Sequence, residues 1–284
     1  MDAPRYCYRH PDRETGLSCS ECGRPICYEC MTPAAVGLRC PDHSGKPQGV
    51  QKVTRAVTHV GERRTNLVTL ILIGINLAVV AVEFASSSSA SFLNNSIYER
   101  GALFASLYNS QGQLVGVAHG EWYRMFTAMF LHASFFHIAL NMYSLYFVGT
   151  IMEQVIGRWR FLLLYVATGI AGSAGALFLS PQTPTVGASG AIFGILGGLL
   201  VLERRRHIAS GGQIAGLIVL NLVITFAFRS SISVGGHVGG LVAGIALMWA
   251  ILEFRRSTLL TLASAAALIV LSFAIAYAKV RNYQ

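Results

Sequence analysis

Long runs of apolar residues recur along the chain from residue 67 onward. Most are long enough to cross a hydrocarbon core of roughly 30 Å as one helix. The fifth run is short, which suits a helix that is little tilted or that moves. The pattern predicts an all-α polytopic membrane protein with seven transmembrane helices, at residues 67–85, 135–152, 161–179, 186–202, 213–228, 232–252 and 257–278.

The composition supports this interpretation. Of the 284 residues, 53% are hydrophobic and 12% are charged, and the mean hydropathy of +0.52 is too high for a soluble protein. The net charge of +9 falls outside residues 1–50, where six basic residues balance six acidic ones. No dense basic patch interleaved with aromatic residues occurs, so we expect the excess charge to face a lipid bilayer and not nucleic acid.

Basic residues divide unequally between the two sides of the predicted membrane domain. Eleven on one side are Lys52, Arg55, Arg63, Arg64, Arg158, Arg160, Arg204, Arg205, Arg206, Arg255 and Arg256, against five on the other. The richer side is cytoplasmic by the positive-inside rule. The first apolar run begins too late for a cleaved secretory signal. We expect a multi-pass protein of the cell membrane with a cytoplasmic N-terminus and an external C-terminus.

Residues 86–134 separate the first two predicted helices and are too many for a simple connection. They include aromatic side chains such as Phe92, Trp122 and Phe126. We expect this segment to pack into the outer leaflet of the membrane. A flexible exposed loop is the alternative, and the serine run at residues 86–89 suits it.

All six cysteines lie between Cys7 and Cys40, so residues 1–45 are expected to form a separate unit. Cysteines and histidines occur there in pairs separated by two residues, a gap that lets a tight turn direct both side chains at one metal ion. Thiolate with imidazole is the ligand set that zinc prefers. So short a segment cannot bury an adequate apolar core, so two structural zinc ions are expected to hold it together.

A cross-brace assigns the eight ligands best, because Cys22 and Cys27 are too close in sequence for neighbouring pairs to share an ion easily. The predicted sets are Cys7, His10, Cys27 and Cys30 for one zinc, and Cys19, Cys22, Cys40 and His43 for the other. The arrangement resembles B-box-like zinc modules. Disulfides are the alternative, which a reducing cytoplasm disfavours. A catalytic zinc is disfavoured because protein ligands fill every position.

The zinc module is expected to bind a cytoplasmic protein partner. Residues 46–65 are polar and basic without sustained periodicity, which predicts a linker to a membrane domain at residues 66–284.

Four polar residues fall at one predicted depth in the membrane, where polar groups are costly and mark function. Ser189 begins the fourth predicted helix and His237 begins the sixth, while His137 and Asn141 share one face at the start of the second. These helices all start on the outer side. A serine, a base and two hydrogen-bond donors are therefore expected to meet in one outer-leaflet cavity.

Glycines at four-residue steps accompany the serine and the histidine. They are Gly190, Gly194 and Gly198 after Ser189, and Gly236, Gly240 and Gly244 around His237. Small residues at this period let two helices touch backbone to backbone. Taken alone, such a pattern more often means plain helix packing; beside Ser189 and His237 it allows hydrogen-bond contact between the two.

The carboxylates restrict the mechanism. No aspartate follows Asp42, and Glu83, Glu153 and Glu253 map to the first helix or to cytoplasmic ends. A Ser-His-Asp triad inside the membrane is thereby excluded, an aspartyl intramembrane protease is disfavoured, and a Ser-His dyad remains. A transporter is disfavoured because it needs buried carboxylates and inverted repeats, and neither is evident.

These motifs resemble those of the rhomboid intramembrane serine proteases, over roughly residues 66–280. The family's His-x4-His-x3-Asn falls at His132, His137 and Asn141, its GxSG at residues 187–190, its HxxGxxxG at His237, Gly240 and Gly244, and its GxxxExxxG at Gly149, Glu153 and Gly157. They occur in family order. The resemblance implies a six-helix core with a seventh, C-terminal helix.

The resemblance also implies roles for single residues. Ser189, within the motif that Gly187 begins, would be the nucleophile and His237 the general base, with no cofactor for catalysis. His137, Asn141 and the backbone N–H of Ser189 would form the oxyanion hole. Supporting positions are His132 in the outer loop, Phe193 on the His237 ring, and Arg124. The family's Trp-Arg pair appears here as Trp122-Tyr123-Arg124.

The implied substrates are single-pass membrane proteins, cleaved near their outer ends after the fifth helix and residues 230–236 move aside. The alternative function is a non-catalytic rhomboid-fold protein that binds transmembrane clients while the zinc module recruits a partner. Intact Ser189 and His237 favour the protease.

Overall fold

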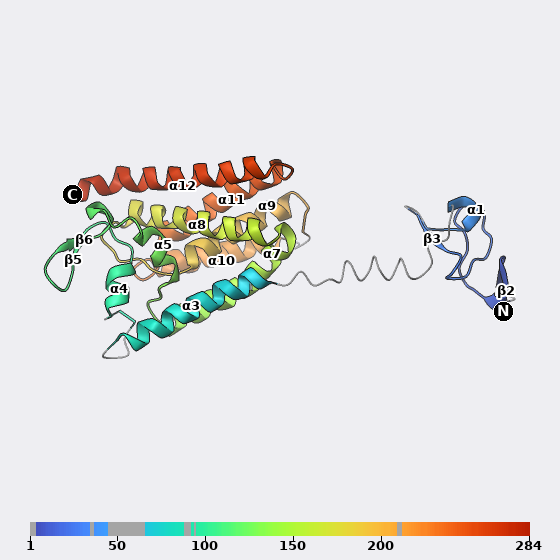
Figure 1. Cartoon of the computed structure of the whole chain (residues 1–284), viewed down its shortest axis with the longest axis horizontal. Helices are drawn as coiled ribbons and strands as arrows, with labels where there is room; N and C mark the ends of the chain where they lie inside the picture. Colours follow the sequence, from blue (N-terminus) through green and yellow to red (C-terminus); the bar gives the residue numbers. More distant parts are fainter. Residues whose placement is uncertain (1–3, 35–36, 45–65, 88–91, 94, 209–211) are drawn as a thin grey trace. The chain divides into compact units, whose positions relative to one another are not determined.

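The structure is a computed structural model that describes residues 4–34, 37–44, 66–87, 92–93, 95–208 and 212–284. The chain divides into two compact units, residues 1–64 and residues 65–284. Each is described by itself (Figure 1). The predicted linker at residues 46–65 lies outside the described residues.

The smaller unit is built from short hairpins around its cysteines. Strand β1 (Tyr6–Cys7) pairs antiparallel with β2 (His10–Glu14), β3 (Thr32–Pro33) pairs with β4 (Leu38–Arg39), and α1 spans Pro41–Ser44. Five cysteines and Ile26 make up its buried cluster. Among the described residues of this cluster, all members except Ile26 are cysteines, so most of it consists of side chains that can bind metal.

Helices at all seven predicted places form the larger unit. They are α3 (Leu67–Ala85), α6 (Phe135–Ser144) continued by the π-helical turn η3 (Leu145–Gly149) and α7 (Thr150–Ile156), α8 (Arg158–Leu179), α9 (Ser189–Arg204), α10 (Gln213–Ala227), α11 (Val234–Glu253) and α12 (Thr258–Val280), followed by the 3-10 turn η4 (Arg281–Tyr283). Five described helical stretches are long and apolar enough to cross a membrane, and α10 is a shorter apolar helix. This is the multi-pass architecture that the apolar runs predict.

Some boundaries differ from the prediction. Helix α9 begins at Ser189 and not at residue 186, and α11 begins at Val234 and not at residue 232. The second predicted helix continues through η3 to Ile156. Polar or glycine-containing segments precede α9 and α11, and hydropathy alone does not separate such segments from the first turn of a helix.

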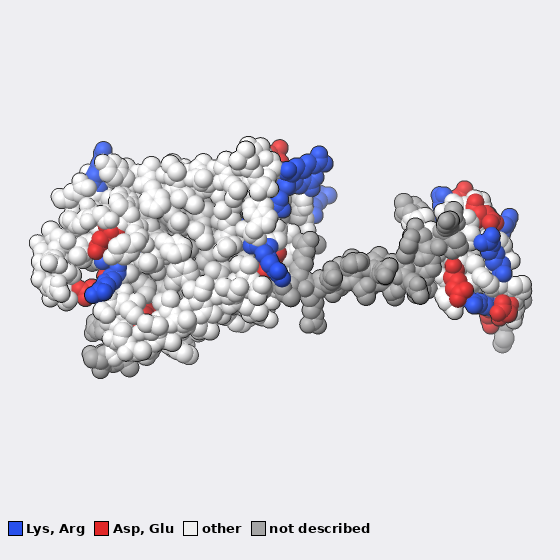
Figure 2. All heavy atoms as spheres, in the orientation of Figure 1, with Lys and Arg blue, Asp and Glu red and all other residues white. Residues whose placement is uncertain are grey.

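Helices α8, α9 and α11 pack against one another at the centre of the larger unit. More than half of α8 is buried, whereas α3 and α10 present mostly exposed apolar side chains. In the view of Figure 2, charged side chains gather at the two ends of this unit and leave a band between them that is nearly free of charge, and exposed apolar side chains of α3 and α10 belong to this stretch of the helices. Such a band is the surface that a hydrocarbon core requires.

The segment between α3 and α6 is ordered over its described residues. It contains α4 (Ser96–Gly101), the hairpin of β5 (Leu107–Tyr108) and β6 (Leu114–Val115), η1 (Val117–His119), α5 (Arg124–Thr127) and η2 (Ala128–Phe130). The run at residues 86–89 is described only as far as Ser87.

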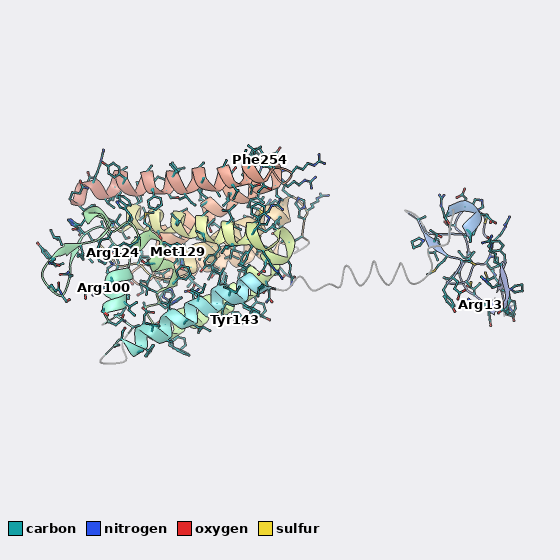
Figure 3. All side chains as sticks on the ribbon, in the orientation of Figure 1. Arg13, Arg100, Arg124, Met129, Tyr143 and Phe254 are labelled. Carbon is teal, nitrogen blue, oxygen red and sulfur yellow. The ribbon has the colours of Figure 1, made fainter. Side chains whose placement is uncertain are left out.

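Arg124 holds this segment together and is only 1% exposed. Its guanidinium donates to a carboxylate oxygen of Glu121 at 2.7 Å and to the carbonyl oxygens of Glu99 and Ala102 at 2.8 Å each. Figure 3 labels Arg124 and Arg100 in this segment. The charge also lies 4.5 Å from the centre of the Phe104 ring. Arginine fits here because its planar fork can satisfy several acceptors at once.

Trp122, whose role the sequence leaves open, packs against α12. Its ring centre lies 5.9 Å from that of Phe273 and 6.5 Å from that of Tyr277. The outer segment is therefore joined to the C-terminal helix by aromatic contacts.

Glu153 on α7 caps the N-terminus of α3. Its two carboxylate oxygens accept hydrogen bonds from the backbone N–H of Val68 at 3.0 Å and from the N–H and hydroxyl of Thr69 at 2.8 Å each. The first N–H groups of a helix have no acceptor within the helix, and a carboxylate there also suits the helix dipole. This contact joins two helices that are far apart in sequence.

Replacing Glu153 by glutamine is expected to destabilise the larger unit by about 1–3 kcal/mol, because the amide nitrogen of glutamine would face N–H donors. Thermal unfolding in detergent measures the loss. The matched control is Glu253→Gln, since Glu253 is exposed at the end of α11. Equal stability of the two variants would contradict this account of the cap.

Candidate active site

Ser189 is the first residue of α9, directly after a tight turn. Gly187 in that turn has a φ of +121°, which an L side chain rarely adopts. A Cβ on Gly187 would also lie 2.6 Å from ring atoms of His137. Both facts require glycine two residues before the serine. The turn leaves the serine at a helix N-terminus, where backbone N–H groups are free to bind an anion.

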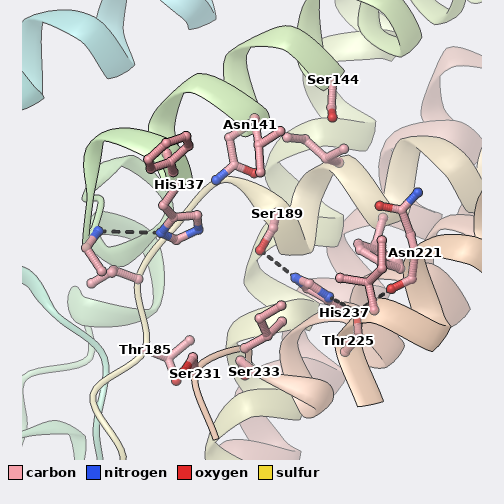
Figure 4. Close-up of a pocket in the computed structure, with 18 of the residues that line it drawn as sticks. His137, Asn141, Ser144, Thr185, Ser189, Asn221, Thr225, Ser231, Ser233 and His237 are labelled. Carbon is pink, nitrogen blue, oxygen red and sulfur yellow. Dashed lines mark hydrogen bonds between the residues drawn. The ribbon is translucent and has the colours of Figure 1, made fainter. Parts of the chain in front are cut away.

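His237 lies in the first turns of α11 and faces Ser189. Its Nε2 is 2.8 Å from the Ser189 Oγ (Figure 4). The imidazole is buried, with the residue 8% exposed, and it stacks on Phe193 with ring centres 4.1 Å apart and an interplanar angle of 18°. Phe193 lies one turn after Ser189 on α9, so the same helix presents the hydroxyl and the surface that orients the ring.

Glycine contacts between helices bring the two residues together. A Cβ on Gly240 would overlap the carbonyl oxygen of Gly190, and a Cβ on Gly244 would overlap that of Gly194. The same close approach joins α8 to α11, where a Cβ on Gly175 would overlap the carbonyl oxygen of Gly235. Three helices therefore meet at backbone distance, and this spacing sets the gap between Ser189 and His237.

Two side-chain donors converge beside the turn that precedes Ser189. The backbone N–H of Ala133 donates to the Nδ1 of His137 at 3.4 Å, so a neutral His137 carries its proton on Nε2. The Nδ2 of Asn141 is buried and, within the described residues, has no hydrogen-bond partner. A Cβ on Gly187 would lie 2.6 Å from the His137 Nε2 and 3.6 Å from the Asn141 Nδ2. Both donors thus point to one place.

His132 is fully buried and does not line the cavity that holds Ser189. Its ring packs edge-on against that of His137, with centres 5.1 Å apart. Arg124 also lies away from the serine, in the outer segment. These two predicted supporting residues shape the surroundings and make no contact with the Ser189–His237 pair.

Thr225 on α10 is a site residue that sequence reasoning missed. Its hydroxyl oxygen lies 2.7 Å from the Nδ1 of His237, on the side of the ring opposite Ser189 (Figure 4). A polar residue within a short apolar helix is a general indication of function. Helical threonines so often bond only to their own backbone that this indication alone does not single out Thr225.

A cavity of about 770 Å³ opens onto these groups. Its lining includes His137, Asn141, Ser189, Thr225 and His237. Apolar residues of α6 and η3 form one wall, including Phe136, Leu140 and Phe147, and residues of α10 form another, including Leu217 and Ile224. The cavity is therefore bounded sideways by two helices with exposed apolar surfaces.

The smaller unit brings its cysteines and histidines together in two groups. One contains Cys7, His10, Cys27 and Cys30, the other Cys19, Cys22, Cys40 and His43, and the ligand atoms of each group lie within 4.8 Å of one another. The Nδ1 of His10 lies 3.3 Å from each Sγ of Cys27 and Cys30, and the Sγ atoms of Cys22 and Cys40 are 3.8 Å apart. A tetrahedral zinc with Zn–S bonds of about 2.3 Å needs edges of about 3.8 Å between sulfur atoms.

Each group contains at least one thiol with a lowered pKa. Burial raises the pKa of Cys7, but hydrogen bonds from the backbone N–H groups of Cys27 and Arg9 lower it by more, and the resulting pKa is about 6. The pKa of Cys19 is also about 6, because backbone hydrogen bonds outweigh the effect of burial. Thiolates are the form that binds zinc.

Comparisons with known proteins agree with the sequence motifs. Residues 119–254 match the family described as Rhomboid domain. The chain is 44% identical over 132 residues to "Rhomboid protease GluP" of Bacillus subtilis, covering 45% of this chain and 26% of that protein. It is 36% identical over 140 residues to "Putative rhomboid protease YdcA" of the same organism, covering 48% and 70%. It is 35% identical over 137 residues to "RHOMBOID-like protein 1" of Arabidopsis thaliana, covering 45% and 34%.

Replacing Gly240 by alanine is expected to destabilise the larger unit by about 1–3 kcal/mol, because the new methyl group would force α11 away from α9. Thermal unfolding in detergent measures this. Gly74→Ala in α3 is the matched control, since nothing lies within 4 Å of a Cβ at that position. A Gly240→Ala protein as stable as the control would show that the helices do not touch here.

Proposed function

The chain belongs to the rhomboid family, and on that premise we propose that it is an intramembrane serine endopeptidase that hydrolyses peptide bonds in or near transmembrane segments of other proteins. The observation that carries the proposal is the 2.8 Å contact between the Ser189 Oγ and the His237 Nε2. A nucleophile and a base within hydrogen-bond reach form the minimal unit of covalent peptide hydrolysis. The chain covers only 26% of the length of the first of these relatives, so the activity and substrates of that protein as a whole are not carried over to this chain.

Ser189 and His237 act as a dyad. The Ser189 Oγ attacks the scissile carbonyl carbon while the His237 Nε2 takes the hydroxyl proton, and the imidazolium then gives that proton to the leaving amine. Water repeats the sequence to release the acyl group from Ser189. Among the described residues that line the cavity there is no aspartate or glutamate, which supports a mechanism without a third, acidic member.

His137, Asn141 and the N–H of Ser189 stabilise the oxyanion of the tetrahedral intermediate. The protonated Nε2 of His137 and the unpartnered Nδ2 of Asn141 support this assignment. The positive end of the α9 dipole lies at the same place. Donors fixed in advance by the fold need no reorganisation when the negative charge develops, and each typically supplies about 100- to 1,000-fold in rate.

The substrate reaches the site sideways, between α6 and α10. The apolar cavity walls from these two helices support this route, and only three of the 15 residues of α10 are buried, so little packing opposes its movement. The connection after α10 is shorter than the sequence suggests, because residues 234–236 belong to α11. A helical substrate must unwind locally before Ser189 can reach a carbonyl, which favours cleavage at small residues in a helix-destabilised stretch.

The chain spans the membrane seven times, with its N-terminus in the cytoplasm and the Ser189–His237 pair near the outer face. The distribution of lysine and arginine between the predicted loops supports this orientation. A protease with this orientation cleaves its substrates close to their external ends.

Two structural zinc ions hold the smaller unit together. Cys7, His10, Cys27 and Cys30 bind one, and Cys19, Cys22, Cys40 and His43 bind the other. The spacing of the ligand atoms and a buried cluster made mostly of cysteines support this assignment. Bound zinc supplies a cross-link and no catalysis, and the module recruits a protein partner in the cytoplasm.

Ser189→Ala and His237→Ala are each expected to abolish cleavage of single-pass reporter proteins in proteoliposomes, with a loss of at least about 1,000-fold, because neither residue acts without the other. Product formation on gels measures this. The controls are Ser144→Ala, which alters another serine of the cavity, and His119→Ala, which alters a histidine of the outer segment. Cleavage by Ser189→Ala at the wild-type rate would reject the dyad.

Purified protein is expected to contain two zinc ions per chain by elemental analysis. Cys30→Ser and Cys40→Ser should each remove at least one, while Ser44→Ala, beside a ligand, should keep both.

Deleting residues 1–45 should leave reporter cleavage in detergent largely unchanged. A wild-type content below two, or collapse of activity on deletion, would contradict the zinc assignment or the modular view respectively.

A further inference from the structure

Thr225 has two polar neighbours and a single hydroxyl proton to share between them. Its Oγ1 lies 2.7 Å from the carbonyl oxygen of Asn221, one turn earlier on α10, and 2.7 Å from the Nδ1 of His237. The residue is 1% exposed. Because so little of the residue is exposed, we assign the directions of these two hydrogen bonds from the chemistry of the groups themselves.

The hydrogen-bond directions follow from the chemistry of the three groups. A carbonyl oxygen can only accept, so the Thr225 hydroxyl donates its proton to Asn221. Towards His237 the hydroxyl oxygen can then only accept, which requires a proton on the His237 Nδ1. A neutral imidazole with its proton on Nδ1 has a lone pair on Nε2, and Nε2 is the atom 2.8 Å from the Ser189 Oγ.

We propose that Thr225 is a positioning residue that holds His237 in the one neutral tautomer able to take the proton of Ser189. The inference rests on the proposed function, because it assigns the residue that prepares the base of that dyad. Thr225 contacts neither substrate nor Ser189 and acts only through the imidazole. It keeps its hydrogen bond when His237 becomes charged, since Nδ1–H donates in both states. A neutral hydroxyl here takes over the orienting part of the role that an aspartate has in a Ser-His-Asp triad.

The location of Thr225 couples this preparation to the position of α10. The three buried residues of α10 are Ile214, Ile218 and Thr225, and the helix packs mainly on α9 and α11. Movement of α10 away from α11 would withdraw the hydroxyl from Nδ1. The dyad is therefore set for proton transfer only when α10 lies against α11, the arrangement that also encloses the site.

The kinetic test compares Thr225→Val with Thr225→Ser. Valine keeps the shape and removes the acceptor, so we expect kcat for reporter cleavage to fall about tenfold, the factor that one neutral hydrogen bond can supply, with KM nearly unchanged. Serine restores the oxygen and should return kcat to within about threefold of wild type. Thr261→Val is the control. Thr261 is a buried threonine of α12, and its hydroxyl also donates to a carbonyl oxygen four residues earlier, that of Ser257.

Unchanged kcat in Thr225→Val would overturn the proposal, as would equal losses in the valine and serine variants. Equal loss of thermal stability in Thr225→Val and Thr261→Val, with loss of kcat only in the former, is the expected pattern. A wild-type protein that cleaves no reporter would reject the proposed function. The tautomer of His237 can then still be measured by NMR, which tests the role of Thr225 separately.

Nitrogen-15 NMR of histidine-labelled protein reads the tautomer without any activity. A His237→Gln sample identifies the signals of His237, and protonated and unprotonated ring nitrogens have distinct chemical shifts. We expect Nδ1 protonated and Nε2 unprotonated in the wild type and in Thr225→Ser, and a mixture in Thr225→Val. A proton on Nε2 in the wild type would overturn the proposal whatever the cleavage assay gives.

Discussion

The close backbone contact between α9 and α11 is the constraint on which the site depends. Ser189 and His237 are 48 residues apart in sequence and lie on different helices, and neither side chain is long. Their atoms meet because Gly190 and Gly240 let the two backbones touch. In lipid the hydrophobic effect does not drive helices together, so such contacts rely on van der Waals packing between small residues. The glycines that stabilise the fold are thus the same ones that assemble the candidate dyad.

Several buried hydroxyl groups of the long helices donate to carbonyl oxygens of their own helices, and this local bonding shapes the chemistry. Thr168 and Ser272 donate to carbonyl oxygens of their own helices, and Thr225 does the same before it accepts from His237. A carboxylate beside the imidazole would have to be buried in the membrane, which is unfavourable in free energy. A hydroxyl that is already bonded to its own helix can orient the ring without adding a charge. A hydroxyl stabilises the charged imidazole less than a carboxylate would, but it orients the ring without burying a charge.

Much of this arrangement could be predicted from the sequence. The apolar runs predict the long helices of the described part of the larger unit, and the positions of Ser189 and His237 at helix starts follow from their glycine-rich surroundings. The two groups of zinc ligands proposed from spacing are the groups that the structure brings together. Such proximity can be predicted because it depends on periodicity and on short spacings along the chain.

Other features could not be predicted, because they depend on contacts between distant segments. Glu153 accepts a hydrogen bond from Val68, 85 residues earlier in the first turn of α3, and nothing local in the sequence indicates this partner. The π-helical turn within the second span and the outer segment built around Arg124 arise from packing. The role of Thr225 could not be predicted either, because it depends on the contact between α10 and the imidazole of His237.

Peptide mapping after treatment with a fluorophosphonate tests the central claim most directly, since such a reagent phosphonylates only a serine whose proton a neighbouring base removes. The account predicts one adduct, on the peptide that contains Ser189, and its disappearance when His237 is replaced by glutamine. An adduct that survives that replacement, or a Ser189 that stays unmodified while the protein is folded, would contradict it.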